Sequence, residues 1–174
     1  MSNNAHPRTS DPRANDAGLR SSTLRIDDGG LDDPRVIALL AKHHAINHEV
    51  TPPESVHVFD LERLRAPDIS FWSAWDGEQL VGVGALKRLD DAHGEVKSMH
   101  TVAEARRGGV GSALLAHIIA SARAMGMRRL SLETGSFEFF RPAVALYAKF
   151  GFRECEPFGE YAPDPNSTFM TLDL

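Results

Sequence analysis

The most informative stretch of the sequence reads Arg106-Arg107-Gly108-Gly109-Val110-Gly111-Ser112. It follows an alternating stretch, residues 94–102, that is typical of a strand, and it precedes a helix predicted over residues 110–125. Glycine lets a backbone approach a ligand closely, and the first turn of a helix presents N–H groups that have no partner inside the helix. The helix dipole and the two arginines add positive potential at the same point. The turn therefore predicts a binding site for a pyrophosphate.

This turn departs from the two common nucleotide-binding motifs. Gly109-x-Gly111 could open a dinucleotide fingerprint, with Glu133 as the acidic residue about 20 residues further on. However, Leu114 occupies the position of the third glycine. A Walker A loop is excluded because no Lys-Ser or Lys-Thr pair follows the glycines. Taken alone, the segment also fits a strand-to-helix turn that binds nothing.

A second block, Ala143-x-x-Leu146-Tyr147-x-x-x-Gly151-Phe152, lies downstream. Arg106-x-x-Gly109-x-Gly111 and this block, in this order, resemble the two signatures of the GNAT acetyltransferases. The elements predicted over residues 23–174 also follow the order of that family, so the resemblance spans nearly the whole chain. Three further stretches are similar to a bacterial branch with mostly unassigned acceptors: residues 67–72, 93–99 and 132–136.

The resemblance implies an N-acetyltransferase that uses acetyl-CoA as its cosubstrate and needs no metal. In the family, the first signature holds the pyrophosphate of coenzyme A. The preceding strand meets the cofactor through its backbone and leaves an N–H to polarise the thioester carbonyl. The family often has Asn where this sequence has Phe140, so no cofactor contact is expected from Phe140. The implied cofactor site comprises Met99, Thr101, Val102, Arg106, Arg107, Gly108, Gly109, Val110, Gly111 and Ser112.

Acetylation of an amine by direct attack in a ternary complex needs a base and an acid. A lysine-like amine has a pKa of about 10.4, so roughly one molecule in 2,500 is neutral at pH 7, which costs about 4.6 kcal/mol. Glu95, on the strand before the glycine turn, is the expected base, unless it only pairs with Lys97. Glu133 is the alternative carboxylate. The resemblance implies that Tyr147 assists the departing thiolate as an acid.

The order of elements predicts an α/β fold, an α+β sandwich in which helices cover both faces of a mixed, largely antiparallel sheet. Residues 1–22 are nearly free of large apolar side chains and are expected to form a flexible tail before a single acetyltransferase domain, residues 23–174. Alternation over residues 94–102 predicts that Glu95, Lys97, Met99 and Thr101 share one face of their strand. Strands are predicted over 23–26, 71–75, 79–87, 94–102, 129–133, 152–155 and 168–174, and helices from Pro34, with Asp33 as N-cap, and over 60–65, 110–125 and 142–150.

Composition narrows the classes of partner. A net charge of −5 argues against binding to nucleic acid, and no run of about 18 apolar residues predicts a membrane helix. The single cysteine, Cys155, excludes an internal disulfide, favours a cytoplasmic location, and has no adjacent histidine that would make it an acyl carrier.

The expected acceptor is an amine of a small molecule or a peptide. His44 and His48, four residues apart on the first helix, are expected on a solvated face or at the rim of the acceptor pocket rather than on a metal. A catalytically silent CoA-binding module is the alternative function, and the sequence leaves open whether the chain forms a homodimer.

Overall fold

The computed structural model describes residues 24–58 and 60–174, so the tail expected over residues 1–22 lies outside the described residues. Seven strands form one sheet in the order β1-β2-β3-β4-β5-β7-β6. All neighbours pair antiparallel except β4 and β5, which are parallel. The strands are β1 (Leu24–Asp28), β2 (Ile69–Asp76), β3 (Gln79–Arg88), β4 (His93–Thr101), β5 (Arg129–Gly135), β6 (Arg153–Glu154) and β7 (Ser167–Asp173).

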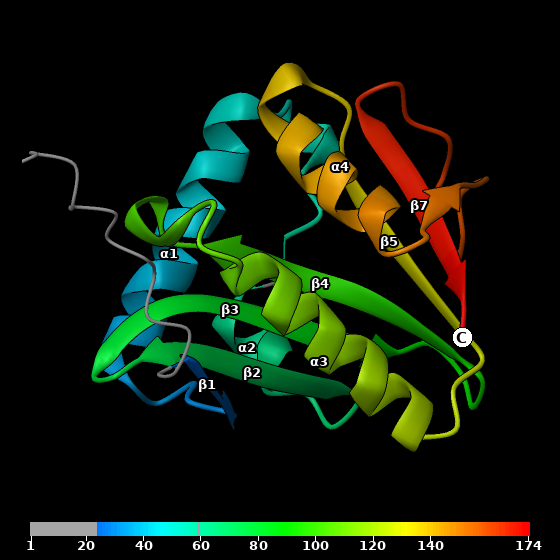
Figure 1. Ribbon diagram of the computed structural model, residues 1–174. Coiled ribbons are helices and arrows are strands. Elements are labelled where there is room, and N and C mark those ends of the chain that lie inside the picture. Colours follow the sequence, from blue (N-terminus) through cyan, green and yellow to red (C-terminus); the bar gives the residue numbers. More distant parts are fainter. Residues whose placement is uncertain (1–23, 59) are drawn as a thin grey trace, which may run out of the picture.

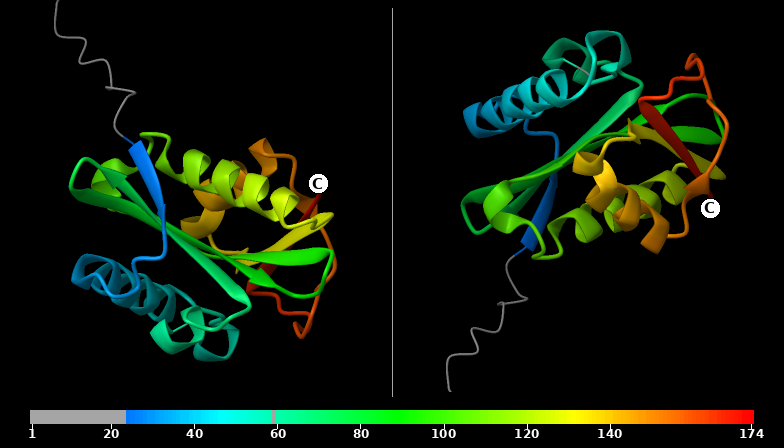
Figure 2. Two further views of the ribbon diagram at one scale, coloured as in Figure 1. Left: turned by 90° about the horizontal axis from the view of Figure 1, so that it is seen from below. Right: turned by 90° about the horizontal axis from the view of Figure 1, so that it is seen from above.

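Helices cover both faces of this sheet, as the sequence predicted (Figure 2). They are α1 (Pro34–Val50), α2 (Leu61–Leu64), α3 (Val110–Ala124) and α4 (Arg141–Lys149), with 3-10 turns η1 (Pro53–Ser55), η2 (Ala103–Ala105) and η3 (Glu138–Phe140). One buried cluster lies between the sheet and α3 and includes Leu114, Ile118 and Tyr147. The other lies between the sheet and α1 and includes Val36 and Leu40. The predicted fold class is thus confirmed, and the predicted element boundaries differ from these by at most about two residues.

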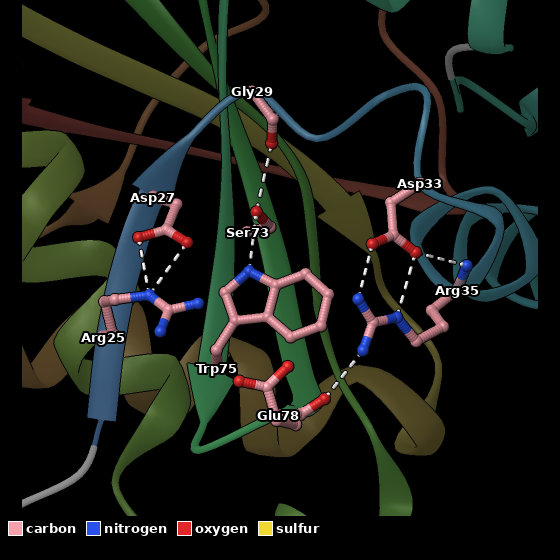
Figure 3. A network of polar contacts seen from close by, with 8 residues as sticks. All are labelled: Arg25, Asp27, Gly29, Asp33, Arg35, Ser73, Trp75 and Glu78. Atoms are coloured by element: carbon pink, nitrogen blue, oxygen red, sulfur yellow. Dashed lines mark hydrogen bonds and ion pairs between the residues drawn. The ribbon is translucent and has the colours of Figure 1, made fainter.

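The first helix begins where the sequence predicted it, because Asp33 caps its N-terminus. The Asp33 carboxylate accepts a hydrogen bond from the backbone N–H of Arg35 at 2.8 Å. The Arg35 guanidinium returns to Asp33 and also donates to the carbonyl of Glu78 at 2.8 Å, in the β2–β3 hairpin (Figure 3). The Trp75 indole N–H donates to the Ser73 hydroxyl beside it. These contacts fix α1 against the sheet.

The parallel strands β4 and β5 pair only over their first residues, from His93 opposite Arg129 to Glu95 opposite Ser131. Beyond this point the register holds no further β4–β5 pair, although both strands continue. Figure 1 shows the two strands meeting near the C-terminus and diverging from there. Divergence of two central strands opens a gap in the sheet that only side chains or a ligand can fill.

A β-bulge at Ser98 overturns the prediction that Glu95, Lys97, Met99 and Thr101 share one face. Lys97 pairs with Ala85 and His100 with Val83, so two residues of β4 stand opposite Gly84 alone. Ser98 accordingly has a positive φ of 52°. Glu95 and Lys97, before the bulge, therefore face the α1 layer. Met99 instead lies where a Cβ on Gly84 would stand, beside Ile118 of α3, and Thr101 lies against Gly111. Strict alternation failed here because the inserted residue reverses the faces.

Among residues 24–58 and 60–174, no helix is both long and apolar enough to cross a membrane.

Candidate functional site

The glycine turn leads from η2 into the N-terminus of α3. Gly109 is the N-cap residue, with φ of 84°, and its carbonyl accepts the first helical hydrogen bond from Ala113. The N–H groups of the first turn, from Val110 to Ser112, therefore precede the helical ladder. Arg107 also has a positive φ, 64°, although it carries a side chain. Strain of this kind concentrates at ligand sites, so the turn has the geometry of an anion cradle.

Gly111 sits where three elements converge. A Cβ atom at this position would lie 3.2 Å from Leu146 Cδ2 on α4 and 3.6 Å from Thr101 Oγ1 on β4. The glycine thus keeps α3, α4 and β4 close together at the cradle. Val102 is less available than predicted, because its N–H donates to the Val81 carbonyl at 3.0 Å. Its carbonyl accepts a hydrogen bond from the Ala105 N–H at 3.1 Å, so one lone pair of that oxygen is left to meet a cofactor.

One cavity fills the gap between β4 and β5. Its lining comes from both faces of the sheet, since α1 and the segment after η1 contribute on one side and α4 on the other. The lining residues are His43, Asn47, Thr51, Ser55, Val56, His57, Val58, Val96, Lys97, Ser98, Met99, Glu133, Thr134, Gly135, Phe140, Ala143 and Tyr147. A group that enters from the α3–α4 side can therefore meet a group that enters from the α1 side.

Tyr147 belongs to this lining, on α4. Its ring is 7% exposed and packs against Phe152. Within the described part of the chain, the Tyr147 hydroxyl has no hydrogen-bond partner, and its oxygen is accessible to solvent. Since Tyr147 lines the cavity, the hydroxyl points into it. Burial raises the pKa of the Tyr147 hydroxyl, and the charge of Glu133 raises it further. The hydroxyl is therefore protonated and free to donate.

Glu133 reaches the cavity from β5. Its carboxylate accepts a hydrogen bond from the Ser167 hydroxyl at 2.7 Å. Burial raises the pKa of Glu133, whereas the Ser167 hydrogen bond and the charge of Lys97 lower it. A carboxylate in this setting is a stronger base than one in water.

Glu95, the expected base, lies behind the lining and is 2% exposed. It accepts a hydrogen bond of 2.6 Å from the Tyr161 hydroxyl and lies 3.2 Å from Lys97 Nζ. Lys97 in turn donates to the Tyr161 oxygen at 2.8 Å and to the His57 carbonyl at 2.9 Å. Glu95 is thus held by two partners, while Glu133 faces the cavity.

His44 and His48 fit the expected solvated face of α1, since His48 is exposed and His44 is half-buried. His44 and His48 stack with ring centroids 4.4 Å apart but do not line the cavity. The neighbouring His43 does, and its Nδ1 lies 3.1 Å from His100 Nδ1 on β4. Burial, helped by the charge of His100, lowers the pKa of His43 to about 3, so His43 is neutral near pH 7. Among the described residues, no three His, Cys, Asp or Glu side chains form a group that could hold a metal.

Phe140, for which no cofactor role was expected, packs its ring onto Gly135 at the edge of the cavity. Cys155 is outside the lining, and burial raises the pKa of its thiol.

Sequence reasoning missed Tyr161, Ser167 and His57. Tyr161 lies in the loop rich in proline and glycine between β6 and β7, Ser167 begins β7, and both reach β4 and β5 only through the fold. One signal in the sequence could have pointed to these residues, namely a lysine, Lys97, on a predicted strand, because a lysine that is buried there needs hydrogen-bond partners.

Comparison with known proteins agrees with this geometry. The family model described as "Acetyltransferase (GNAT) family" matches residues 36–152. The chain is 52% identical over 151 residues to the uncharacterized N-acetyltransferase YsnE of Bacillus subtilis, across 87% of this chain and 99% of the relative. It is 41% identical over 140 residues to the IAA acetyltransferase of Azospirillum brasilense, across 80% of this chain and 90% of the relative.

Solved structures share the fold. A putative acyl-CoA N-acyltransferase from Klebsiella pneumoniae superposes with a TM-score of 0.71 and 28% identity, over 87% of this chain and 97% of the other. A GNAT acetyltransferase from Elizabethkingia anophelis, solved with acetyl-CoA bound, gives a TM-score of 0.64 at 19% identity, over 88% and 99%.

Proposed function

The chain belongs to the GNAT family of acetyltransferases and is an acetyl-CoA-dependent N-acetyltransferase, and we propose that it transfers the acetyl group by direct attack of a primary amine in a ternary complex. The acceptor is a small molecule or a peptide. Direct attack is favoured because the single cysteine lies outside the cavity and its thiol pKa is raised, so no thiol there can carry an acyl group. Its relatives named as N-acetyltransferases favour this function over a silent CoA-binding module.

The proposed cofactor site is the glycine turn with the end of β4. Arg106, Arg107 and the N–H groups of residues 109–112 hold the pyrophosphate, since the N–H groups of the first α3 turn precede the helical ladder and two cations flank them. The Gly108 N–H already donates to the Ala105 carbonyl at 3.2 Å, so Gly108 contributes close approach of its backbone. The backbones of Met99 and Thr101 and the carbonyl of Val102 guide the rest of the cofactor along β4. The bulge at Ser98 supports a special role for this backbone, because it removes the regular β3 pairing just where the strands diverge.

The observation that carries the proposal is that Tyr147 and Glu133 face one cavity, which crosses the sheet between β4 and β5. In this arrangement a thioester from the α3–α4 side and an amine from the α1 side meet in the gap. Proximity of this kind accounts for a large part of catalysis in a two-substrate reaction.

Tyr147 is the proposed acid. Its hydroxyl donates a hydrogen bond to the sulfur that leaves as a thiolate. Because its pKa is raised, stabilisation by the hydrogen bond contributes more than complete proton transfer.

Glu133 and Glu95 are the two candidates for the base, and we assign the role to Glu133. Glu133 lines the cavity and has one neutral hydrogen-bond donor, Ser167. Glu95 already accepts from Tyr161 and pairs with Lys97, so taking a proton would disrupt a buried ion pair. Glu95 therefore supports the catalytic residues by holding this cluster in place.

The test is thiol release from acetyl-CoA in a panel of primary amines, amino acids and peptides, with IAA included because a relative is named for it. Intersecting initial-velocity patterns support a ternary complex, whereas parallel patterns require a covalent acyl-enzyme and would refute direct attack.

With an acceptor known, Glu133→Gln and Glu95→Gln separate the two carboxylates. Glu133→Gln should lower kcat/KM most near neutral pH, and the loss should shrink in alkali because solution then supplies neutral amine. Glu95→Gln should give a loss that does not depend on pH. The reverse pattern would identify Glu95 as the base.

A further inference from the structure

Lys97 is the one formal cation among the described residues that line the cavity, when histidines are counted as neutral. An ammonium has three N–H donors. The Lys97 donors meet the Tyr161 oxygen at 2.8 Å, the His57 carbonyl at 2.9 Å and Glu95 Oε1 at 3.2 Å. The Tyr161 and His57 contacts are hydrogen bonds and the Glu95 contact is an ion pair, so partners from separate segments of the chain surround the ammonium.

Aromatic packing also holds this network in place. The Tyr161 ring packs edge-on against His57, with centroids 5.0 Å apart, and against Phe169 at 5.4 Å. The Lys97 side chain is 6% exposed. An ammonium that is held by three acceptors and buried under an aromatic ring cannot turn to a new anion without breaking this cluster.

Among the described residues in and behind the cavity, two carboxylates, Glu95 and Glu133, share one ammonium, Lys97. The charge of Glu95 is balanced by Lys97, with which it forms the ion pair. Within residues 24–58 and 60–174, the hydrogen-bond donor to Glu133 is the neutral hydroxyl of Ser167. The other ionisable groups that act on it are His57 from the segment after η1, Glu95 and Lys97 from β4, Tyr147 from α4 and Tyr161 from the β6–β7 loop. The formal charge of the group is therefore −1, located at Glu133.

Building on the proposed function, we propose that the acceptor is a primary amine with no carboxylate next to its amino group, and that Glu133 excludes such a carboxylate. An incoming ammonium balances the charge of Glu133 before it loses its proton. An α-amino acid would bring a second carboxylate beside Glu133. Lys97 already forms an ion pair with Glu95 and does not pair with that incoming carboxylate. Repulsion inside a cavity of low polarity is larger than in water, so the discrimination is substantial.

The experiment measures binding to the CoA-saturated protein by isothermal titration calorimetry, with matched probes in two sizes. The larger set is phenethylamine, L-phenylalaninamide and L-phenylalanine, and the smaller set is ethylamine, glycinamide and glycine. In at least one set the amine and the amide should bind at least tenfold more tightly than the amino acid. The amide controls for size, because it replaces the carboxylate with a neutral group of nearly the same shape.

Two variants locate the effect. Glu133→Gln should reduce the difference between amide and amino acid to less than threefold, because it removes the unbalanced charge while keeping the shape. Glu154→Gln, which makes the same change of charge on the exposed strand β6, should leave the difference unchanged.

Equal or tighter binding of the amino acid would overturn this inference and leave the proposed function intact. A difference that survives Glu133→Gln would also overturn it, by removing Glu133 as the cause. If CoA binds but no amine of either set binds or is acetylated, the inference and the assignment of this cavity to the acceptor both fail.

Discussion

The substitution Tyr147→Phe tests the mechanism with the least disturbance of the fold. It keeps the ring that packs against Phe152 and removes one hydroxyl that has no hydrogen-bond partner among the described residues. Removing an unpaired buried hydroxyl breaks no interaction in the free protein, so the free energy of unfolding should stay the same or rise slightly.

The expected loss appears only in turnover. A hydrogen bond to a charged group contributes about 1.5 to 3 kcal/mol, and each 1.36 kcal/mol corresponds to a factor of ten in rate. If the Tyr147 hydroxyl donates to the departing thiolate, kcat should fall by about 10- to 100-fold. The affinity for acetyl-CoA should be nearly unchanged, because the interaction forms fully only when the thiolate develops.

The second tyrosine of the chain supplies a matched control. The Tyr161 hydroxyl donates to Glu95 at 2.6 Å and accepts from Lys97 at 2.8 Å. Tyr161→Phe should therefore cost about 1 to 3 kcal/mol of stability and lower Tm by several degrees.

The assay combines thiol release with the acceptor that the panel identifies, calorimetric titration with CoA, and thermal unfolding of each variant. A Tyr147→Phe protein with unchanged kcat would refute the acid assignment. A protein that loses stability as Tyr161→Phe does would show that the hydroxyl has a structural partner.

Three further substitutions test other parts of the site and fold. Gly109→Val places a branched side chain at φ of 84°, which costs about 1 to 2 kcal/mol of stability, and it should weaken CoA binding at least tenfold, about 1.4 kcal/mol. The control is Gly126→Val, at φ of 81° with equally open space, which should lose similar stability but no CoA affinity by calorimetry. Asp33→Ala should lower the urea midpoint at pH 7, and the difference in midpoint from the unsubstituted protein should shrink between pH 3.8 and 2. The reason is that the Arg35 hydrogen bonds depress the pKa of Asp33 from 3.8 to about 2, and this stabilisation is lost as the carboxylate protonates. A difference in midpoint that persists below pH 2 would exclude the charge as its source. Gly135→Ala should lower Tm and kcat together, since its Cβ would overlap the Phe140 ring at the cavity edge, and normal values of both would show that the ring moves aside without cost.

Local patterns were sufficient for most of the fold. Asp33 followed by Pro34 begins a helix wherever it occurs, because a carboxylate cap and a fixed φ act within one turn of the chain. The same holds for the glycine turn, whose conformation depends on neighbours in sequence and which begins α3 as predicted.

The bulge at Ser98 could not be foreseen in this way. Its cause is the pairing of β4 with β3, and the residues themselves continue an alternating pattern. A single inserted residue then moved Met99 and Thr101 to the α3 face, away from Lys97.

By itself, the sequence determined the family, the order of the elements and the turn that the cofactor is expected to meet, because each of these depends on residues close together in the chain. Only the tertiary structure decided which carboxylate faces the cavity. Glu95 and Glu133 both lie on strands that lead to the site, and nothing near either one distinguishes a base from a buried partner. The distinction comes from Tyr161 and Ser167, which reach the two carboxylates from 66 and 34 residues away. Hydrogen bonds across such distances are set by the packing of the sheet, and the proposed assignment of Glu133 as the base and Glu95 as a buried support rests on them.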